Sequence, residues 1–273
     1  CVTAEDYKVF VKRFYPNTEA VSIFGGESGS FDPVLGVSSV QEFGKVFISI
    51  KSTTGNFIPQ VEKRRLVERL SPFTVASITP VIVDPETLFL ILDVSSTFNP
   101  NLTTLTSNDL ESVIVNSLTN FNNNNLKTFN SAFRHSQVTK LIDDSDTSLT
   151  SNVTKVVMGK FFTPLLDESV GYTISFNNSI YNPHSKHNSD QGGVVASTGF
   201  KVSGDATNEM FLDDDGSGYI RRFFILAGVK NYLDDKAGTV DYATGTIKLN
   251  PLTVTLVSNV DNTSSTQIRI TSI

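Results

Sequence analysis

Two stretches of the chain repeat apolar residues at the spacing of an α-helix, and each follows a residue that caps helices. The first follows Thr3, and its apolar residues are Tyr7, Phe10, Val11 and Phe14. The second follows Thr106 or Ser107, and its apolar residues are Leu110, Val113, Ile114, Leu118 and Phe121. A threonine or serine in this place accepts hydrogen bonds from the free amides of the first turn. Because Pro16 and the asparagine run at 122–125 end the two patterns, we predict helices over 4–14 and from about 107 to 121.

Shorter runs rich in β-branched and aromatic residues predict strands near the first helix. Residues 20–24 and 46–50 have this composition, and Pro59 suits the first position of a helix that runs to about Leu70. Together with the first helix, these elements predict a small α+β module at residues 1–72.

A second module, at residues 73–163, has a different predicted order of elements. Two strand-like runs, 77–83 and 87–94, flank Asp84-Pro85-Glu86, a sequence typical of tight turns. We therefore predict an antiparallel hairpin, followed by the long helix, a shorter helix from Ser136 and a closing strand. The order hairpin, helix, helix, strand predicts an α/β sandwich module with its helices on one face of the sheet.

From about residue 164 the helical spacing disappears, and short strands alternate with turn residues. Strands are expected at 171–176, 193–202, 219–227, 246–248 and 252–257, with a long exposed loop at 181–193. Residues 164–273 are therefore predicted to form an all-β, sandwich-like domain. The predicted fold class is α+β, with two small α/β sandwich modules followed by this β domain.

The net charge of the chain argues against nucleic acid as a partner. The chain has a net charge of -6, whereas nucleic-acid binding needs clustered lysine and arginine. The one basic cluster, Lys63-Arg64-Arg65, lies on a predicted helix beside Glu62 and Glu68, which is typical of a solvated helix face. The sequence also contains no apolar run of the roughly 18 residues that a membrane span needs. We expect neither nucleic acid nor a membrane as a partner.

The strongest candidate for chemistry is an acidic stretch in the β domain. Asp213, Asp215 and Ser217 have the spacing of the first oxygen ligands in a calcium-binding loop. The position that needs the closing acidic ligand is Phe224, however, and both flanks read as strand rather than helix. We prefer an acidic β-turn with solvated carboxylates and assign no metal. Asp213, Asp215 and Ser217 stay weak candidates.

The remaining polar clusters do not indicate catalysis. His184 and His187 lie near Asp190, but in a predicted loop and with no third ligand marked by the sequence. Neighbouring carboxylates occur at predicted turns or helix ends: Asp143-Asp144, Asp213–Asp215 and Asp234-Asp235. Neither a nucleophile elbow nor a phosphate-binding glycine loop is present. We predict that the chain is not an enzyme and needs no cofactor.

Two stretches, in the right order and at the right distance, resemble one family. They are Val2–Tyr7 with the helix behind it, and Phe133–Ser136 followed by Ile142-Asp143-Asp144 and Ser151-Asn152. This order resembles the baseplate J-like proteins of contractile phage tails, and within them the C-terminal part of the large wedge subunit of T4-like phages. The resemblance covers most of residues 1–162.

The resemblance implies a structural part of the virion, located in the tail baseplate and assembled in the host cytoplasm. Family members pair within each baseplate wedge, and their C-terminal regions close an inner ring that passes the host-binding signal to the sheath. The implied partners are the chain itself, as a homodimer, and other wedge and hub proteins. Because the chain opens on a helix cap without a methionine, we also expect it to be cut from a longer protein.

An alternative interpretation starts from Cys1, the only cysteine. Mature bacterial lipoproteins carry their lipid on a cysteine at this position, so the alternative is a lipid-anchored surface protein that binds glycan or calcium through its β domain. A helix that starts so soon after Cys1 leaves no flexible tether, which favours the baseplate interpretation.

Overall fold

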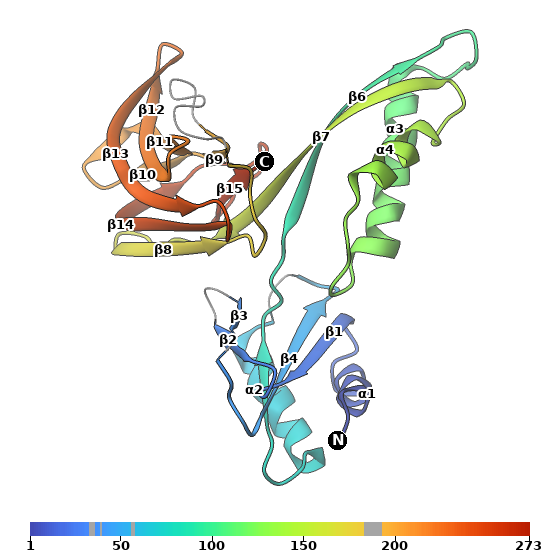
Figure 1. The fold of residues 1–273 in the computed structure, drawn as a ribbon, viewed down its shortest axis with the longest axis vertical. Helices are drawn as coiled ribbons and strands as arrows, with labels where there is room; N and C mark the ends of the chain where they lie inside the picture. Colours follow the sequence, from blue (N-terminus) through green and yellow to red (C-terminus); the bar gives the residue numbers. More distant parts are fainter. Residues whose placement is uncertain (33–35, 39, 56–57, 183–192) are drawn as a thin grey trace. The chain divides into compact units, whose positions relative to one another are not determined.

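The computed structural model describes residues 1–32, 36–38, 40–55, 58–182 and 193–273. The chain forms two compact units (Figure 1): unit 1 holds most of residues 1–155, and unit 2 holds most of residues 156–273. All the described helices lie in unit 1, whereas unit 2 is built from strands. The mixed α and β class and the β-rich C-terminal region are therefore confirmed. The division into modules at residues 72 and 163 stays a prediction.

The first half of unit 1 is a three-stranded sheet with two helices. Its elements are α1 (Ala4–Phe14), β1 (Thr18–Gly25), β4 (Lys45–Ser52), α2 (Gln60–Leu70) and β5 (Thr79–Val83), while β2 (Ser30–Asp32) and β3 (Gly36–Ser38) form a separate pair. β4 lies in the centre, antiparallel to β1 and parallel to β5. The two helices and the sheet bury one core, formed by Tyr7, Val11, Ile48, Ile50, Ile58, Leu66, Leu70 and Ile82.

The hairpin predicted from residues 77–83 and 87–94 is wrong. β5 pairs with β4, and the strand that follows, β6 (Phe89–Phe98), belongs to another sheet. α2 carries the chain from β4 to β5, as a parallel pair requires a crossover. Lys63 Nζ donates to Asp84 Oδ2 at 2.5 Å and links α2 to the end of β5. β5 does end just before Asp84, where the turn was predicted. However, Ile82 is buried in the first core, so β5 pairs with β4 and not with β6.

Both helix caps predicted from the sequence are present. The Thr3 hydroxyl accepts from the Asp6 amide at 3.3 Å, and the Asp6 carboxylate accepts from the Thr3 amide at 3.0 Å. The same reciprocal pair joins Thr106 and Asp109 at the start of α3 (Ser107–Phe121). Such a capping box satisfies two donors that the first turn of a helix leaves free.

The second half of unit 1 packs α3 and α4 (His135–Asp143) on one face of β6 and β7 (Leu149–Phe162). Its buried residues are Ile114, Phe121, Val138 and Ile142, and Leu92, Val94 and Leu149 of the two strands pack against them. The asparagine run was expected to end the long helix. α3 does end at Phe121, and Asn122–Leu126 follow it as one π-helical turn, η2, closed by Lys127 N donating to Asn122 O at 3.2 Å.

The sheet of unit 2 closes into a ring, because β10 pairs with both β14 and β11. Its strands are β8 (Ser169–Ser175), β9 (Val195–Ser197), β10 (Phe200–Val202), β11 (Asp205–Asp214), β12 (Tyr219–Leu226), β13 (Val229–Asp241), β14 (Thr246–Val257) and β15 (Ile268–Ser272). The order is β10-β14-β13-β12-β11-β9-β15-β7-β6, and β10 also pairs with β11. The predicted sandwich of two sheets therefore differs from the observed single sheet. The short β10 bridges β11 and β14 and joins the two sides.

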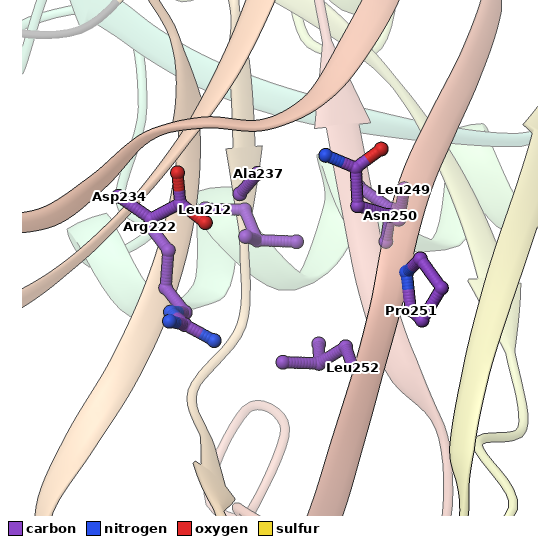
Figure 2. Close-up of a pocket in the computed structure, with 8 residues that line it drawn as sticks. All are labelled: Leu212, Arg222, Asp234, Ala237, Leu249, Asn250, Pro251 and Leu252. Atoms are coloured by element: carbon purple, nitrogen blue, oxygen red, sulfur yellow. The ribbon is translucent and has the colours of Figure 1, made fainter.

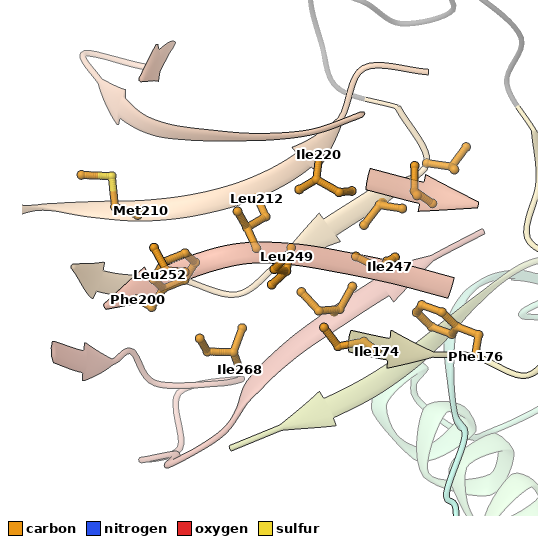
Figure 3. Packing of buried hydrophobic residues seen from close by; sticks show 14 of the residues in the cluster. Ile174, Phe176, Phe200, Met210, Leu212, Ile220, Ile247, Leu249, Leu252 and Ile268 are labelled. Carbon is orange, nitrogen blue, oxygen red and sulfur yellow. The ribbon is translucent and has the colours of Figure 1, made fainter. Parts of the chain in front are cut away.

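The ring encloses the largest core of the molecule (Figure 3). The labelled residues of this core come from many strands: Ile174, Phe176, Phe200, Met210, Leu212, Ile220, Ile247, Leu249, Leu252 and Ile268. The two strands expected at 246–248 and 252–257 are one strand, β14, with a register shift against β8 between Leu249 and Leu252. The sequence patterns missed β11, β13 and β15. Most of the expected loop at 181–193 lies outside the described residues.

Candidate functional site

The acidic stretch of unit 2 is the most charged buried site described. Asp213 is the second-last residue of β11, next to the turn into β12, and only 2% of its surface is exposed. Its Oδ1 accepts from Arg221 Nε at 3.0 Å, and its Oδ2 accepts from Lys230 Nζ at 2.8 Å and from the Tyr232 hydroxyl at 3.0 Å. These donors come from β12 and β13, so one carboxylate joins three consecutive strands.

Aromatic rings surround these two cations. The Arg221 guanidinium lies 4.2 Å from the centre of the Tyr232 ring, and Lys230 Nζ lies 4.4 Å from that of Phe223. Burial, and then the nearby Asp213 charge, raise the pKa of Tyr232 to about 12, so its hydroxyl keeps its proton and donates. Cations stacked on rings and bonded to one carboxylate are held in place, which favours a structural role.

Asp214 is a second buried carboxylate, with 0% exposure, and it faces the core. Its Oδ1 accepts from Val195 N at 2.7 Å, and its Oδ2 accepts from the Tyr242 hydroxyl at 2.7 Å and from Gly216 N at 3.3 Å. Burial and the hydrogen bond to Asp214 raise the pKa of Tyr242. A side chain at Gly193 would collide with the Asp214 carboxylate, with its Cβ 2.1 Å from Oδ2. Asp214 therefore pins the start of β9 to the β11–β12 turn.

The rest of the candidate calcium-binding stretch is a turn in which the Asp215 carboxylate accepts hydrogen bonds from backbone amides of the same turn. Asp215 Oδ1 accepts from Ser217 N at 2.7 Å and from Tyr219 N at 3.0 Å, and Ser217 is exposed. The expectation that all three aspartates are solvated is wrong for Asp213 and Asp214, because each carboxylate found donors on distant strands. Among the described residues, no three histidine, cysteine, aspartate or glutamate side chains gather as a metal site. The candidates His184, His187 and Asp190 lie outside the described residues.

Other polar side chains, among them the carboxylate pairs expected at turns or helix ends, contact residues of their own or of an adjacent element. His135 begins α4, and its Nε2 lies 2.9 Å from the carbonyl oxygen of Thr154. Asp143 and Asp144 lie at the end of α4, as expected, and Asp144 pairs with Lys140 at 2.6 Å. Asp234-Asp235 was expected at a turn, but both residues lie inside β13. There Asp234 is registered opposite Arg222 of β12, which explains how an acidic pair fits in a strand.

A small cavity lies beside this arrangement in unit 2 (Figure 2). Its lining residues are Leu212, Arg222, Asp234, Ala237, Leu249, Asn250, Pro251 and Leu252. The cavity measures about 20 Å³, enough for a single water molecule and far below the several hundred Å³ of a typical ligand site. Arg222, one of these lining residues, has a buried Nε without a hydrogen-bond partner among the described residues.

Exposed apolar side chains gather on the β12–β13 hairpin near its turn. Ile225, Leu226, Val229 and Leu233 are each 52–64% exposed, and the turn between the strands uses Ala227 and Gly228 at positive φ. Sequence patterns did not single out this tip, because exposed apolar residues look the same as buried ones in a strand pattern. None of the helices in the described ranges has the length and apolarity to cross a membrane.

Comparisons with known proteins match the first part of the chain. Residues 3–83 match the family model of baseplate structural protein gp6, C-terminal domain I, and residues 86–160 match that of its C-terminal domain III. The chain is also similar to the baseplate wedge protein gp6 of Enterobacteria phage T4, at 28% identity over 159 residues. That stretch is 58% of this chain and 22% of the relative, so it spans about a fifth of the relative's length.

Proposed function

We propose a structural role in the tail baseplate for this chain, which belongs through residues 3–83 and 86–160 to the family of baseplate structural protein gp6. The observation that carries the proposal is the match of two C-terminal domains of one protein, in succession, on one chain. Wedge proteins of this kind are components of the virion tail, which agrees with the location expected from the sequence.

The chain acts by assembly. It pairs with a second copy of itself and contacts other wedge and hub proteins, and the pairs contribute to the inner ring of the baseplate. Through that ring it couples host binding to contraction of the sheath. The family resemblance supports these finer roles. The exposed apolar tip of the β12–β13 hairpin supports a chain with contact surfaces outside its cores.

No catalytic step is part of the proposal. The buried carboxylates that drew attention in the sequence, Asp213 and Asp214, accept hydrogen bonds from six different residues within unit 2 and hold strands together. A catalytic acid or base needs access to a substrate, and these two groups are 2% and 0% exposed.

Light scattering of the purified chain tests self-pairing. We expect a species of about 60 kDa at high micromolar concentration, twice the chain mass of 29.8 kDa. A strict monomer at that concentration would overturn self-pairing.

Immunogold labelling of whole virions with an antibody to this chain tests location, and gold away from the baseplate end of the tail would overturn it. An acyl chain on Cys1, found by mass spectrometry, would support the lipid-anchored alternative instead.

A further inference from the structure

β6 is the last strand of its sheet and carries a free edge. Among the described strands it pairs only with β7, where Thr97 Oγ1 lies 2.6 Å from Ser151 Oγ. Its residues Ser95, Ser96, Thr97 and Phe98 are all exposed. A free edge presents a row of backbone donors and acceptors, and such a row can pair with a strand of another chain.

A run of four consecutive exposed residues without charge or proline, at 95–98, separates β6 from the free edges of β1, β5, β7 and β13. Natural proteins protect free edges with charged residues or proline. The other exposed edges carry such residues: Glu19 in β1, Pro80 in β5, Lys155 in β7, and Lys230, Asp234, Asp235 and Lys236 in β13. β8 is an uncharged edge, but its side chains from Tyr172 to Ser175 are half-buried or buried. β6 has one charged residue, Asp93, and its exposed residues Ser95–Phe98 include neither a charge nor a proline.

The sequence of β6 is complementary to itself in one antiparallel register. A two-fold axis perpendicular to a sheet keeps the same face of both strands on the same side, so even-numbered residues must oppose even-numbered ones. With the axis at Ser95, Leu92 opposes Phe98 on the face that packs under α3 and α4. Asp93 opposes Thr97 on the other face, where a hydroxyl can donate to a carboxylate.

We propose that β6 pairs with β6 of a second copy of this chain, antiparallel and with Ser95 on the two-fold axis. The result is a four-stranded sheet, β7-β6-β6-β7, that continues through both copies. The pairing would cover part of the exposed Phe98 ring with the partner's Leu92 and separate the two Asp93 charges by four residues along the strands. This inference rests on the self-pairing of the proposed function and adds the surface that performs it.

The test places a like charge on the axis. In Ser95→Lys each introduced lysine faces its own copy, so the light-scattering mass should fall from about twice 29.8 kDa to the monomer value. The matched control is Asn116→Lys, which adds the same charge on the exposed side of α3 and should leave the dimer intact. Circular dichroism should show both variants folded, because both positions are exposed.

Two further variants make the result specific to this register. Ser95→Glu should also be monomeric alone, and mixing it with Ser95→Lys should restore the dimer through a lysine–glutamate pair across the axis. In a Cys1→Ser background, Ser95→Cys should form an intermolecular disulfide on mild oxidation, since opposed antiparallel residues have the Cα separation that a disulfide needs. Asn116→Cys in the same background should not.

The outcomes separate this inference from the proposed function. A wild-type dimer that survives Ser95→Lys, without cross-linking at Ser95→Cys, would overturn the β6 surface and leave self-pairing standing. A wild-type chain that is monomeric throughout would overturn both. Loss of the dimer in Ser95→Lys and its return in the mixture would support both.

Discussion

The two units use carboxylates in opposite ways. In unit 1, Asp6 and Asp109 lie on the surface and bond to a threonine three residues away. In unit 2, Asp213 and Asp214 are buried, and their side-chain donors lie 8 to 28 residues away. A cap forms as soon as its own turn forms, whereas the buried pair needs several strands in place. Asp6 and Asp109 therefore help to specify where helices begin, and Asp213 and Asp214 help to specify how strands are arranged.

The largest expected effect comes from removing the buried carboxylate of Asp213. Asp213→Ala leaves Arg221 and Lys230 without their shared partner, and breaking a buried ion pair in this way typically costs about 3–5 kcal/mol. Scanning calorimetry should show a large loss of stability in the transition of unit 2. The control is Asp144→Ala, which removes an exposed carboxylate from Lys140 and should change little. Equal effects of the two substitutions would contradict the comparison.

A smaller effect is expected at the helix caps. Thr106→Ala removes the hydroxyl that accepts from the Asp109 amide, and losing such a cap costs about 1 kcal/mol. Urea unfolding followed by the helical signal in circular dichroism measures it. Thr119→Ala, on the exposed side of the same helix, removes an equal group without a capping role and serves as the control. A loss at Thr119 as large as that at Thr106 would mean that the cap is not the cause.

Acidification should weaken the same caps. Backbone hydrogen bonds from Thr3 lower the pKa of Asp6, and the Thr106 hydroxyl lowers that of Asp109, from the ordinary value of 3.8. Because the folded pKa values are depressed, the stabilisation is present above pH 3.8 and disappears as the pH falls through the folded values. The helical signal of the wild type should therefore decline over this range. In an Asp6→Asn, Asp109→Asn double variant that part of the decline should be missing, and an unchanged acid profile would refute the assignment.

The smallest effect is expected from calcium. Both Asp213 oxygens already accept hydrogen bonds within unit 2, and Phe224 stands where a calcium loop needs its closing acid. Millimolar calcium should therefore leave the melting temperature almost unchanged, with magnesium as the matched control. A large upward shift with calcium alone would show that the Asp213 turn rearranges to bind the ion.

Elements with local signals could be predicted from the sequence, and elements with distant partners could not. The starts of α1 and α3 follow from Thr3 and Thr106, whose capping partners are three residues away. The pairing of β5 with β4 depends on the whole crossover through α2, and the turn sequence after β5 carries no information about it. β13 was missed because its acidic pair, Asp234-Asp235, is typical of turns.

The same limit applied to the candidate site. The sequence identified Asp213 and Asp215 as acidic residues near a turn, and Asp215 does bond within that turn. The partners of Asp213 on β12 and β13 become neighbours only when the two strands pair. No spacing rule indicated Lys230 or Tyr232, since residues 17 and 19 positions away meet here through a specific hairpin register. Sequence patterns predicted the elements of the site better than its contacts.

The pairing of β15 with β7 has a consequence for synthesis on the ribosome. Ile268–Ser272 align with Met158–Phe162, so the strands on either side of this contact are made more than a hundred residues apart. Unit 1 can fold while later residues are still being translated, whereas the sheet of unit 2 stays incomplete until residues 268–272 have left the ribosome. During that interval residues 158–162 of β7 remain unpaired on the edge that later binds β15. A host chaperone that shields nascent strands would therefore benefit unit 2 more than unit 1.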